Sequence, residues 1–122
     1  MGDKTEVFID DVNGRSDVKV ITIKGAIDAV TSPDVDKTVL PVIERGDANI
    51  ILDLSNVEYL SSTGMMCLIR YLVYSTGRRR IFRLVRPPQN VYDTLMVAGI
   101  AKHFNISDTV GDAIERSMKE NK

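Results

Sequence analysis

Three hydroxyl residues stand together in the middle of the chain, Ser61, Ser62 and Thr63, and Gly64 follows them. An apolar run precedes them and an amphipathic helical pattern follows, which places them at the start of a predicted helix. The first N–H groups of a helix lack intrahelical partners and lie at the positive end of its dipole, which favours an anion there. The run therefore predicts either a phosphoacceptor site or ordinary helix capping by Ser and Thr.

The helix predicted after these hydroxyls, over residues 64–76, carries one apolar stripe, made of Met65, Leu68, Ile69, Leu72 and Val73. If the stripe faces a sheet, Met66, Arg70 and Tyr74 point away from it, together with part of Cys67 and Tyr71. Methionine and tyrosine beside arginine are enriched at protein interfaces. The start of this helix is therefore a predicted docking face, with a few incidentally exposed apolar residues as the alternative.

Other chemistry finds less support in the sequence. His103 is the only histidine and Cys67 the only cysteine, so they predict no zinc-type ligand cluster. No nucleophile-elbow motif accompanies any serine, which argues against a Ser-His-Asp site. Arginines gather at 78–80, at Arg83 and at Arg86. A charged turn between a helix and a strand explains them, because no aromatic residues are interleaved for stacking on nucleic acid.

The first half of the chain predicts the elements that must position the hydroxyls. Strands at 5–9 and 17–24 flank Asn13-Gly14, which is typical of an antiparallel hairpin. A helix opens at Thr31-Ser32-Pro33, with a hydroxyl cap and an early proline, and ends near residue 45. The almost continuous apolar run 49–54 is typical of a strand buried on both faces of a partly parallel sheet.

The second half continues the alternation of helices and strands. Gly77 is predicted to end the 64–76 helix in the left-handed conformation, and Gly99 to end a helix that begins after Pro87-Pro88. Strands are predicted at 80–85 and 103–106, and a last helix, capped by Ser107-Asp108, over 109–120. The order β-β-α-β-α-β-α-β-α predicts an α/β fold with one mixed sheet of four to five strands and four helices.

Composition sets the limits of function. The chain has 122 residues, 43% of them hydrophobic, and a formal net charge of −1, which fits one domain over 1–122. A net charge this small produces no long-range electrostatic attraction for nucleic acid or an anionic membrane. Neither is therefore expected as a direct partner. The single cysteine, the lack of an apolar signal core and the lack of a spanning segment indicate a cytoplasmic protein.

Two motifs carry a resemblance to a known family. Asp53-Leu54-Ser55 at a strand end leads through Val57 and Tyr59-Leu60 into the run 61–65, and Gly25-Ala26-Ile27-Asp28-Ala29 follows an earlier strand. This arrangement resembles the STAS domain, the fold of bacterial anti-sigma factor antagonists. The resemblance implies that the residue before the glycine, Thr63, is phosphorylated, and that Asp28 lies nearby. By itself, Asp28 is equally typical of a turn or a helix cap.

Two positions depart from the family pattern. Ser61 stands where many antagonists have an aspartate, which removes a negative charge beside the acceptor. The acceptor is a threonine, whose methyl group a kinase pocket must accommodate. Ser62 and Ser61 are therefore alternative acceptors. The neighbourhood of the site comprises Asp28, Ser61, Ser62 and Gly64.

The resemblance implies a regulator with no cofactor of its own, not an enzyme. The unphosphorylated protein would bind an anti-sigma factor, a GHKL-type serine/threonine kinase that carries ATP, and so release a sigma factor. The contacts implied are Asp28, Met65, Met66, Arg70 and Tyr74. Phosphorylation at the helix start would switch binding off. The alternative function is that of a non-switching STAS scaffold or a ligand-binding signalling module.

Overall fold

The chain opens with the predicted antiparallel hairpin. The computed structural model describes residues 4–120, with side chains for 4–118. Strand β1 (Glu6–Val12) pairs with β2 (Arg15–Ile27), and Gly14 in the turn has φ +78°, a conformation that glycine adopts at little cost. The hairpin is confirmed, but β2 runs 13 residues and reaches Ile27. Because of this extra length, β2 ends directly before Asp28.

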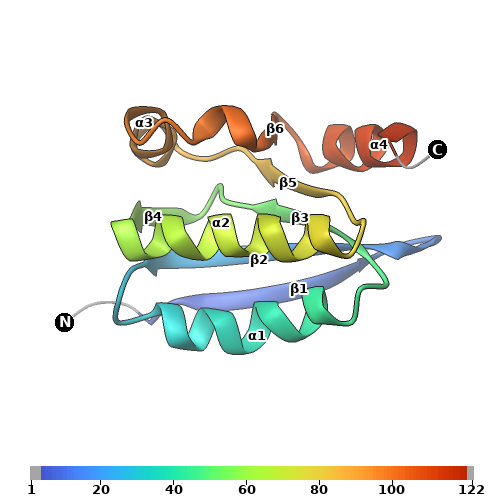
Figure 1. Cartoon of the computed structure of the whole chain (residues 1–122), viewed down its shortest axis with the longest axis horizontal. Helices are drawn as coiled ribbons and strands as arrows, with labels where there is room; N and C mark the ends of the chain where they lie inside the picture. Colours follow the sequence, from blue (N-terminus) through green and yellow to red (C-terminus); the bar gives the residue numbers. More distant parts are fainter. Residues whose placement is uncertain (1–3, 121–122) are drawn as a thin grey trace.

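The rest of the main sheet is parallel. Strands β2, β3 (Asn49–Asp53), β5 (Phe82–Val85) and β6 (Asn105–Ser107) are neighbours in the order β1-β2-β3-β5-β6. Parallel neighbours require crossover connections, and helices supply them (Figure 1). The C-terminal ends of these strands therefore lie along one edge of the sheet. This arrangement confirms the predicted mixed α/β architecture.

One further strand was not predicted. β4 (Val57–Leu60) pairs in parallel with the end of β2, with Ile27 opposite Leu60, and lies off the path of the main sheet. Only Val57 and Leu60 of its four residues are buried, which leaves too little periodic pattern for a strand to be predicted from sequence. Because β4 ends at Leu60, it delivers the three hydroxyl residues to the C-terminal end of β2.

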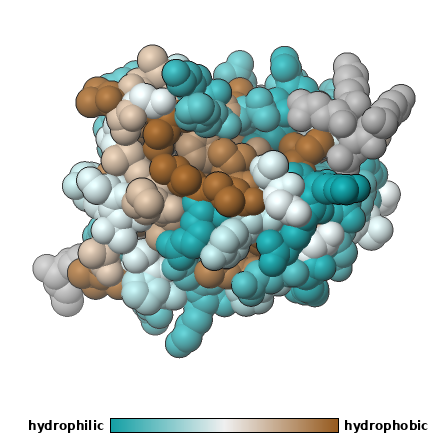
Figure 2. Space-filling view, viewed as in Figure 1, coloured by the Kyte–Doolittle hydropathy of each residue, from teal (hydrophilic) through white to brown (hydrophobic). Residues whose placement is uncertain are grey.

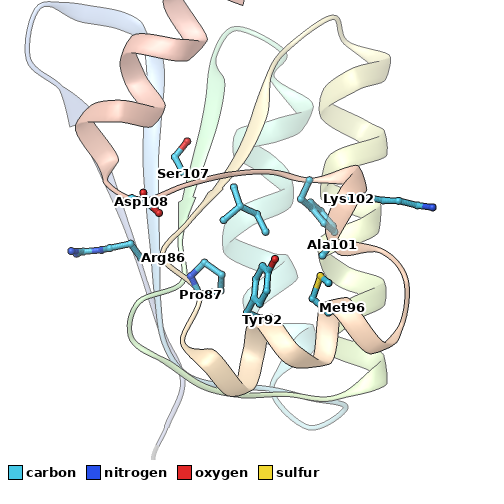
Figure 3. A pocket seen from close by; sticks show the side chains of 10 residues that line it. Arg86, Pro87, Tyr92, Met96, Ala101, Lys102, Ser107 and Asp108 are labelled. Atoms are coloured by element: carbon cyan, nitrogen blue, oxygen red, sulfur yellow. The ribbon is translucent and has the colours of Figure 1, made fainter.

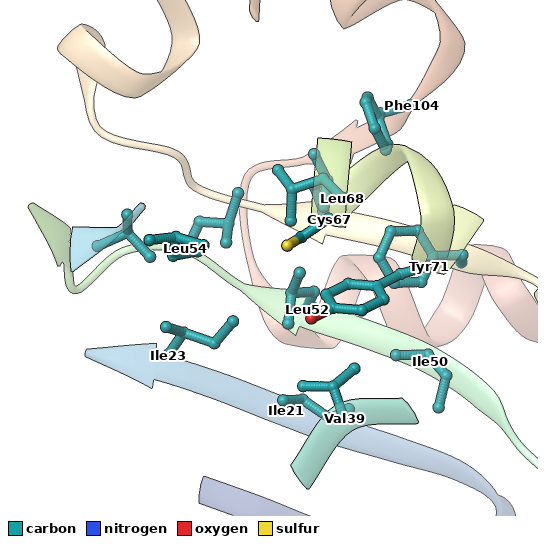
Figure 4. Packing of buried hydrophobic residues seen from close by; sticks show 14 of the residues in the cluster. Ile21, Ile23, Val39, Ile50, Leu52, Leu54, Cys67, Leu68, Tyr71 and Phe104 are labelled. Carbon is teal, nitrogen blue, oxygen red and sulfur yellow. The ribbon is translucent and has the colours of Figure 1, made fainter. Parts of the chain in front are cut away.

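Helices cover the two faces of the sheet with separate cores. Helices α1 (Ser32–Glu44), α2 (Ser62–Gly77) and α3 (Gln89–Val97) pack over the larger core, which includes Ile21, Ile23, Ile50, Leu52, Leu68, Tyr71, Leu84 and Leu95 (Figure 4). Helix α4 (Val110–Glu120) covers a smaller cluster on the other face, formed by Val18, Val20, Ile51, Val85 and Ala113. Since Ile50 and Ile51 of β3 enter different cores, the prediction of a strand buried on both faces is confirmed.

The prediction that Gly77 ends α2 in the left-handed conformation is wrong: the left-handed residue lies two positions later. Gly77 is the last helical residue, and Arg79 instead has the positive φ, 59°. The backbone N–H groups of Arg78 and Arg80 both donate to the carbonyl of Ser75, at 3.1 and 2.9 Å. The chain therefore reaches the left-handed conformation, with these bonds around it, two residues later than the glycine suggests.

Two further details near the C-terminus differ from prediction. Residues Ala101–His103 form a short 3-10 helix, so the predicted strand at 103–106 begins only at Asn105. The cap of α4 is Thr109, whose Oγ1 accepts a hydrogen bond from the backbone N–H of Asp112 at 3.0 Å. Ser107, predicted as part of the cap, belongs to β6. Gly99, with φ +75°, follows α3 in the left-handed conformation as predicted.

Candidate functional site

The hydroxyl residues and the Asp28 loop meet where β2 and β4 end together. Ile27 is the last residue of β2 and lies opposite Leu60, the last residue of β4. The backbone N–H of Ser61 donates to the carbonyl of Ile27 at 3.0 Å. Asp28 and Ser61 therefore leave two paired strand ends side by side. The structure brings together the two motifs that the sequence separates by more than 30 residues.

Ser61 is the N-cap of α2. Its backbone is extended, with φ −83° and ψ 176°, and its Oγ accepts a hydrogen bond from the backbone N–H of Gly64 at 3.1 Å. Its carbonyl accepts the N–H of Met65 at 2.8 Å. The capping role that the sequence left open for the hydroxyl run is thus confirmed for this residue. Aspartate caps helices about as well as serine, so the departure from the family pattern preserves the local structure.

Ser62 and Thr63 form the first turn of α2 and are both exposed. Within residues 4–118, whose side chains the structure describes, neither hydroxyl has a hydrogen-bond partner. No acidic side chain lies in this first turn. Both hydroxyls therefore stand free beside unpaired helix N–H groups, at the positive end of the helix dipole.

Gly64 allows the first turn of α2 to touch the end of β2. A Cβ atom at this position would lie 2.3 Å from the carbonyl oxygen of Ile27 and 2.8 Å from a methyl carbon of Leu60. Real Cβ atoms do not approach backbone oxygen so closely, so only glycine fits without a shift of the main chain. The glycine thereby fixes the position of the two free hydroxyls relative to the Asp28 loop.

Asp28 holds its own loop together. Its Oδ1 accepts hydrogen bonds from the backbone N–H groups of Val30 and Thr31, at 2.9 and 3.0 Å. These bonds, above all that from Thr31, lower the pKa of the Asp28 carboxyl below its ordinary value, so it is ionised at neutral pH. The turn function expected for an isolated aspartate is confirmed, and its charge remains at the surface beside α2.

Thr31 closes the same loop from the other side. Its Oγ1 accepts a hydrogen bond from the backbone N–H of Asp28 at 3.0 Å and donates to the carbonyl of Ala26 at 2.9 Å. The predicted hydroxyl cap of α1 is therefore wrong in detail, because Thr31 occupies the N-cap position without a side-chain capping bond. The hydroxyl instead holds together the loop that connects β2 to α1.

The predicted face of α2 is rotated from the observed one. The buried residues are Gly64, Cys67, Leu68, Tyr71 and Ser75, so Cys67 and Tyr71 lie in the core and not partly outside it. Val73, predicted to face the sheet, is 57% exposed. The contact of Gly64 with β2 sets the rotation of the helix. Tyr71 lies seven residues, or about two turns, after Gly64 and therefore faces the core on the same side. Burial also raises the pKa of the Cys67 thiol.

A polar network between α1 and α2 explains how Tyr71 is accommodated. Asp36 of α1 accepts a hydrogen bond from the Tyr71 hydroxyl and one from Arg70 Nη1 at 2.8 Å. Burial and the bond to Asp36 raise the pKa of Tyr71. Sequence reasoning missed Asp36, because its partners lie 34 and 35 positions away and no local pattern marks them.

The predicted docking residues of α2 therefore differ in availability. Met66 is 60% exposed, whereas Arg70 is paired with Asp36 and Tyr74 packs against the core beneath Arg78, whose guanidinium lies 5.7 Å from its ring. Met65 is half-buried. Figure 2 shows apolar side chains gathered over α2 and toward α3.

The remaining sequence candidates have structural explanations. Arg78 donates to the carbonyl of Tyr74 at 3.1 Å and Arg80 to that of Gly46 at 2.9 Å, so these arginines bind carbonyls at helix C-terminal ends. His103 lies exposed in the 3-10 helix. Among residues 4–118, no three His, Cys, Asp or Glu side chains gather to hold a metal. No helix within the described range is long and apolar enough to cross a bilayer.

Fold and site together define a class: a mixed sheet with helices on both faces, and a helix start with free hydroxyls beside an acidic loop. A model of the STAS domain family matches residues 11–113. The protein therefore belongs to the STAS domain family, as the sequence motifs indicated.

Relatives share this architecture over nearly their whole length. The anti-sigma-F factor antagonist RsfB of Mycobacterium tuberculosis is 28% identical over 112 residues, which cover 92% of this chain and 88% of RsfB. An anti-sigma factor antagonist from Mycobacterium paratuberculosis superposes with a TM-score of 0.83 at 24% identity, over 93% of this chain and 94% of the other. The antagonist SpoIIAA, in its unphosphorylated form, gives a TM-score of 0.76 at 17% identity, over 91% and 95%. SpoIIAA of Bacillus is also known in a phosphorylated form.

Proposed function

We propose that this protein is an anti-sigma factor antagonist that binds its anti-sigma factor when unmodified and loses binding when Thr63 is phosphorylated. The observation that carries the proposal is the free, exposed hydroxyl of Thr63 on the first turn of α2, beside the Asp28 loop. The name of its relative RsfB and its membership of the STAS family support the same function.

The unmodified binding surface comprises the Asp28 loop and the start of α2. Val30 of the loop is 85% exposed and Met66 of the helix is 60% exposed. Val30 belongs to the Asp28 loop and Met66 lies three residues after Thr63 on α2, so a partner that covers this surface buries apolar area near Thr63. Arg70 and Tyr74, tied into the molecule, belong to the edge of this surface and contribute less to binding than Met66.

The chemical step takes its catalyst from the partner, a kinase that binds ATP. The Thr63 Oγ attacks the γ-phosphorus of that ATP, a new P–O bond forms, and the bond to the ADP oxygen breaks. The hydroxyl proton passes to a base of the partner. The chain described here supplies the nucleophile and its position, so it acts as a substrate and regulator.

The added phosphate changes charge where the partner must approach. It brings a charge of about −1.5 to −2 at neutral pH, next to the ionised Asp28 carboxylate. The N-terminus of α2 stabilises this charge within the free protein. In the complex the phosphate would be desolvated beside a carboxylate, so binding is lost while the fold stays intact.

Binding to a candidate anti-sigma factor, measured by calorimetry with Thr63→Ala and Thr63→Glu, tests the proposal. We expect Thr63→Ala to bind like the unmodified protein and Thr63→Glu to bind at least about tenfold more weakly, with its urea midpoint retained. Thr76→Glu, an exposed threonine at the other end of α2, is the matched control and should bind normally. If Thr63→Glu binds as tightly as the wild type, the protein is instead a non-switching STAS module.

A further inference from the structure

A hollow of about 630 Å³ opens where β5 and β6 end, away from the hydroxyl site. The residues around it follow β5, belong to α3, or lie between the start of the 3-10 helix and the residue after β6, and none of them is part of the Asp28 loop or of α2. In parallel α/β sheets, ligands bind in the crevice outside the carboxyl ends of the strands. The volume is also typical of pockets for small molecules. Position and size therefore both suit a ligand site.

The backbone at the edge of this hollow is strained. Arg86, the residue that follows β5, has φ +46°, although it carries a side chain and precedes Pro87. Both features disfavour that conformation. A hydrogen bond from the Arg86 N–H to the carbonyl of Ser107, 3.1 Å long, holds it in place against the end of β6. Strained residues held by their surroundings cluster at functional sites.

The lining of the hollow combines aromatic and apolar side chains with polar and charged ones. Tyr92 and Met96 of α3 form one wall, and Phe104 and Ile106 lie on the side of β6. Figure 3 shows the ring of Tyr92 beside Met96 at the opening. Aromatic rings pack well against a tyrosine ring, and the sulfur of methionine makes a further favourable contact with them. These side chains suit a ligand with an aromatic body.

Charged side chains border the hollow with a net positive charge. Arg86 and Lys102 lie on opposite sides of it, and Asp108 is the single acidic residue (Figure 3). Within the described residues, neither cation forms an ion pair through its side chain. Their long side chains extend outward and are exposed, so they can turn over the opening within nanoseconds. The net positive charge around the hollow would attract one anionic group on a ligand.

We propose that this hollow binds a small aromatic carboxylic acid, with the ring against Tyr92 and Met96 and the carboxylate held by Arg86 or Lys102. The site is independent of the proposed partner switch, since it shares no residue with it. Ligand and anti-sigma factor therefore need not compete, and each can be tested without the other.

The test uses the full chain and three soluble probes, followed by amide shifts in NMR titrations. The probe 4-phenylbutyrate carries both the ring and the charge, 4-phenylbutanamide the ring alone, and acetate the charge alone. We expect saturable shifts at residues 86–108 with 4-phenylbutyrate, with a dissociation constant of roughly 1 mM. Binding of the other two should be at least about tenfold weaker. Equal binding of the amide, or shifts that do not saturate, would overturn the proposal.

Variants locate the site on the molecule. Met96→Trp should fill the opening and weaken binding of 4-phenylbutyrate at least about tenfold, whereas Val97→Trp, at a neighbouring position of α3 that is 90% exposed, should leave it unchanged. The double variant Arg86→Gln with Lys102→Gln should weaken binding about fivefold, and Lys37→Gln on α1 should not. Unchanged binding in Met96→Trp, with a dispersed spectrum that shows it is folded, would contradict the assignment.

Discussion

Gly64 and Gly77 lie in the same helix, but only Gly64 is required by its surroundings. A Cβ at Gly64 would meet the carbonyl of Ile27 at 2.3 Å, whereas nothing lies within 4 Å of a Cβ at Gly77. We therefore expect Gly64→Ala to lower the free energy of unfolding by about 3 kcal/mol. Gly77→Ala should raise it by about 0.5 kcal/mol, because alanine is the better helix former. Urea unfolding of both variants measures the difference.

Equal effects of the two alanine substitutions would contradict this account of the α2 contact. A large loss at Gly64 also predicts a functional consequence, since the same contact places Thr63 beside the Asp28 loop. Residual folded Gly64→Ala protein should therefore bind an anti-sigma factor less tightly than the wild type.

Asp28 predicts a dependence of stability on pH. Hydrogen bonds from Thr31 and Val30 lower its pKa below the ordinary value of 3.8, so the folded state favours the charged form. The resulting stabilisation is complete above pH 3.8 and is lost as the pH falls through the lowered pKa of the folded state. The stability gap between the wild type and Asp28→Asn should therefore shrink when urea unfolding is moved from about pH 7 to about pH 2. A gap that stays constant would show that the carboxylate charge does not stabilise the loop.

Single residues differ in how far the sequence reveals them. The placement of residues 61–64 at the start of a helix could be predicted, because a hydroxyl run before an amphipathic pattern is a local signal, whereas the selection of Thr63 as phosphoacceptor rests on the family resemblance and stays a prediction. Asp36 could not, because its bonds to Arg70 and Tyr71 depend on how α1 packs against α2. The double use of Thr31, as acceptor and donor inside the loop, likewise depends on the three-dimensional path of the chain.

At the scale of the element, the start of α2 depends on the Ser61 cap. Its Oγ satisfies the N–H of Gly64 at 3.1 Å. Ser61→Ala should lower the free energy of unfolding by about 1 kcal/mol, and Ser61→Asp should retain it, because aspartate supplies an equivalent acceptor and favours the helix dipole. Thermal unfolding followed by circular dichroism distinguishes the two. A loss in Ser61→Asp as large as in Ser61→Ala would mean that the hydroxyl has a function other than capping.

Elements also show why the sequence misplaced one helix face. The stripe from Met65 to Val73 has the right spacing, but the contact of Gly64 with β2 turns the helix so that Cys67 and Tyr71 face inward. The buried Tyr71 is accommodated because its hydroxyl donates a hydrogen bond to the Asp36 carboxylate. Periodicity in one helix cannot report a partner on another, and the four-residue β4 is too short to show a period at all.

For the whole molecule, most of the architecture could be predicted from sequence. The hairpin, the strand buried on both faces, the parallel crossovers and the four helices follow from patterns that a single segment contains. Besides β4 and the rotation of α2, the departures lie at element ends, around Arg79, Asn105 and Thr109, where short-range hydrogen bonds decide where a helix or strand begins or ends. In the proposed switch, a single phosphate would add about −1.5 to −2 to this near-neutral chain, whose net charge is −1.

The most direct test of the partner switch is to map the phosphate itself. The full chain is incubated with its candidate anti-sigma factor and ATP, and the product is analysed by intact mass and by fragmentation of the peptide that contains residues 61–64. We predict one phosphate, on Thr63, and none in Thr63→Ala, while Ser62→Ala is modified like the wild type. A phosphate on Ser62, on Ser61 or elsewhere in the chain, or no phosphate at all, would contradict the central claim.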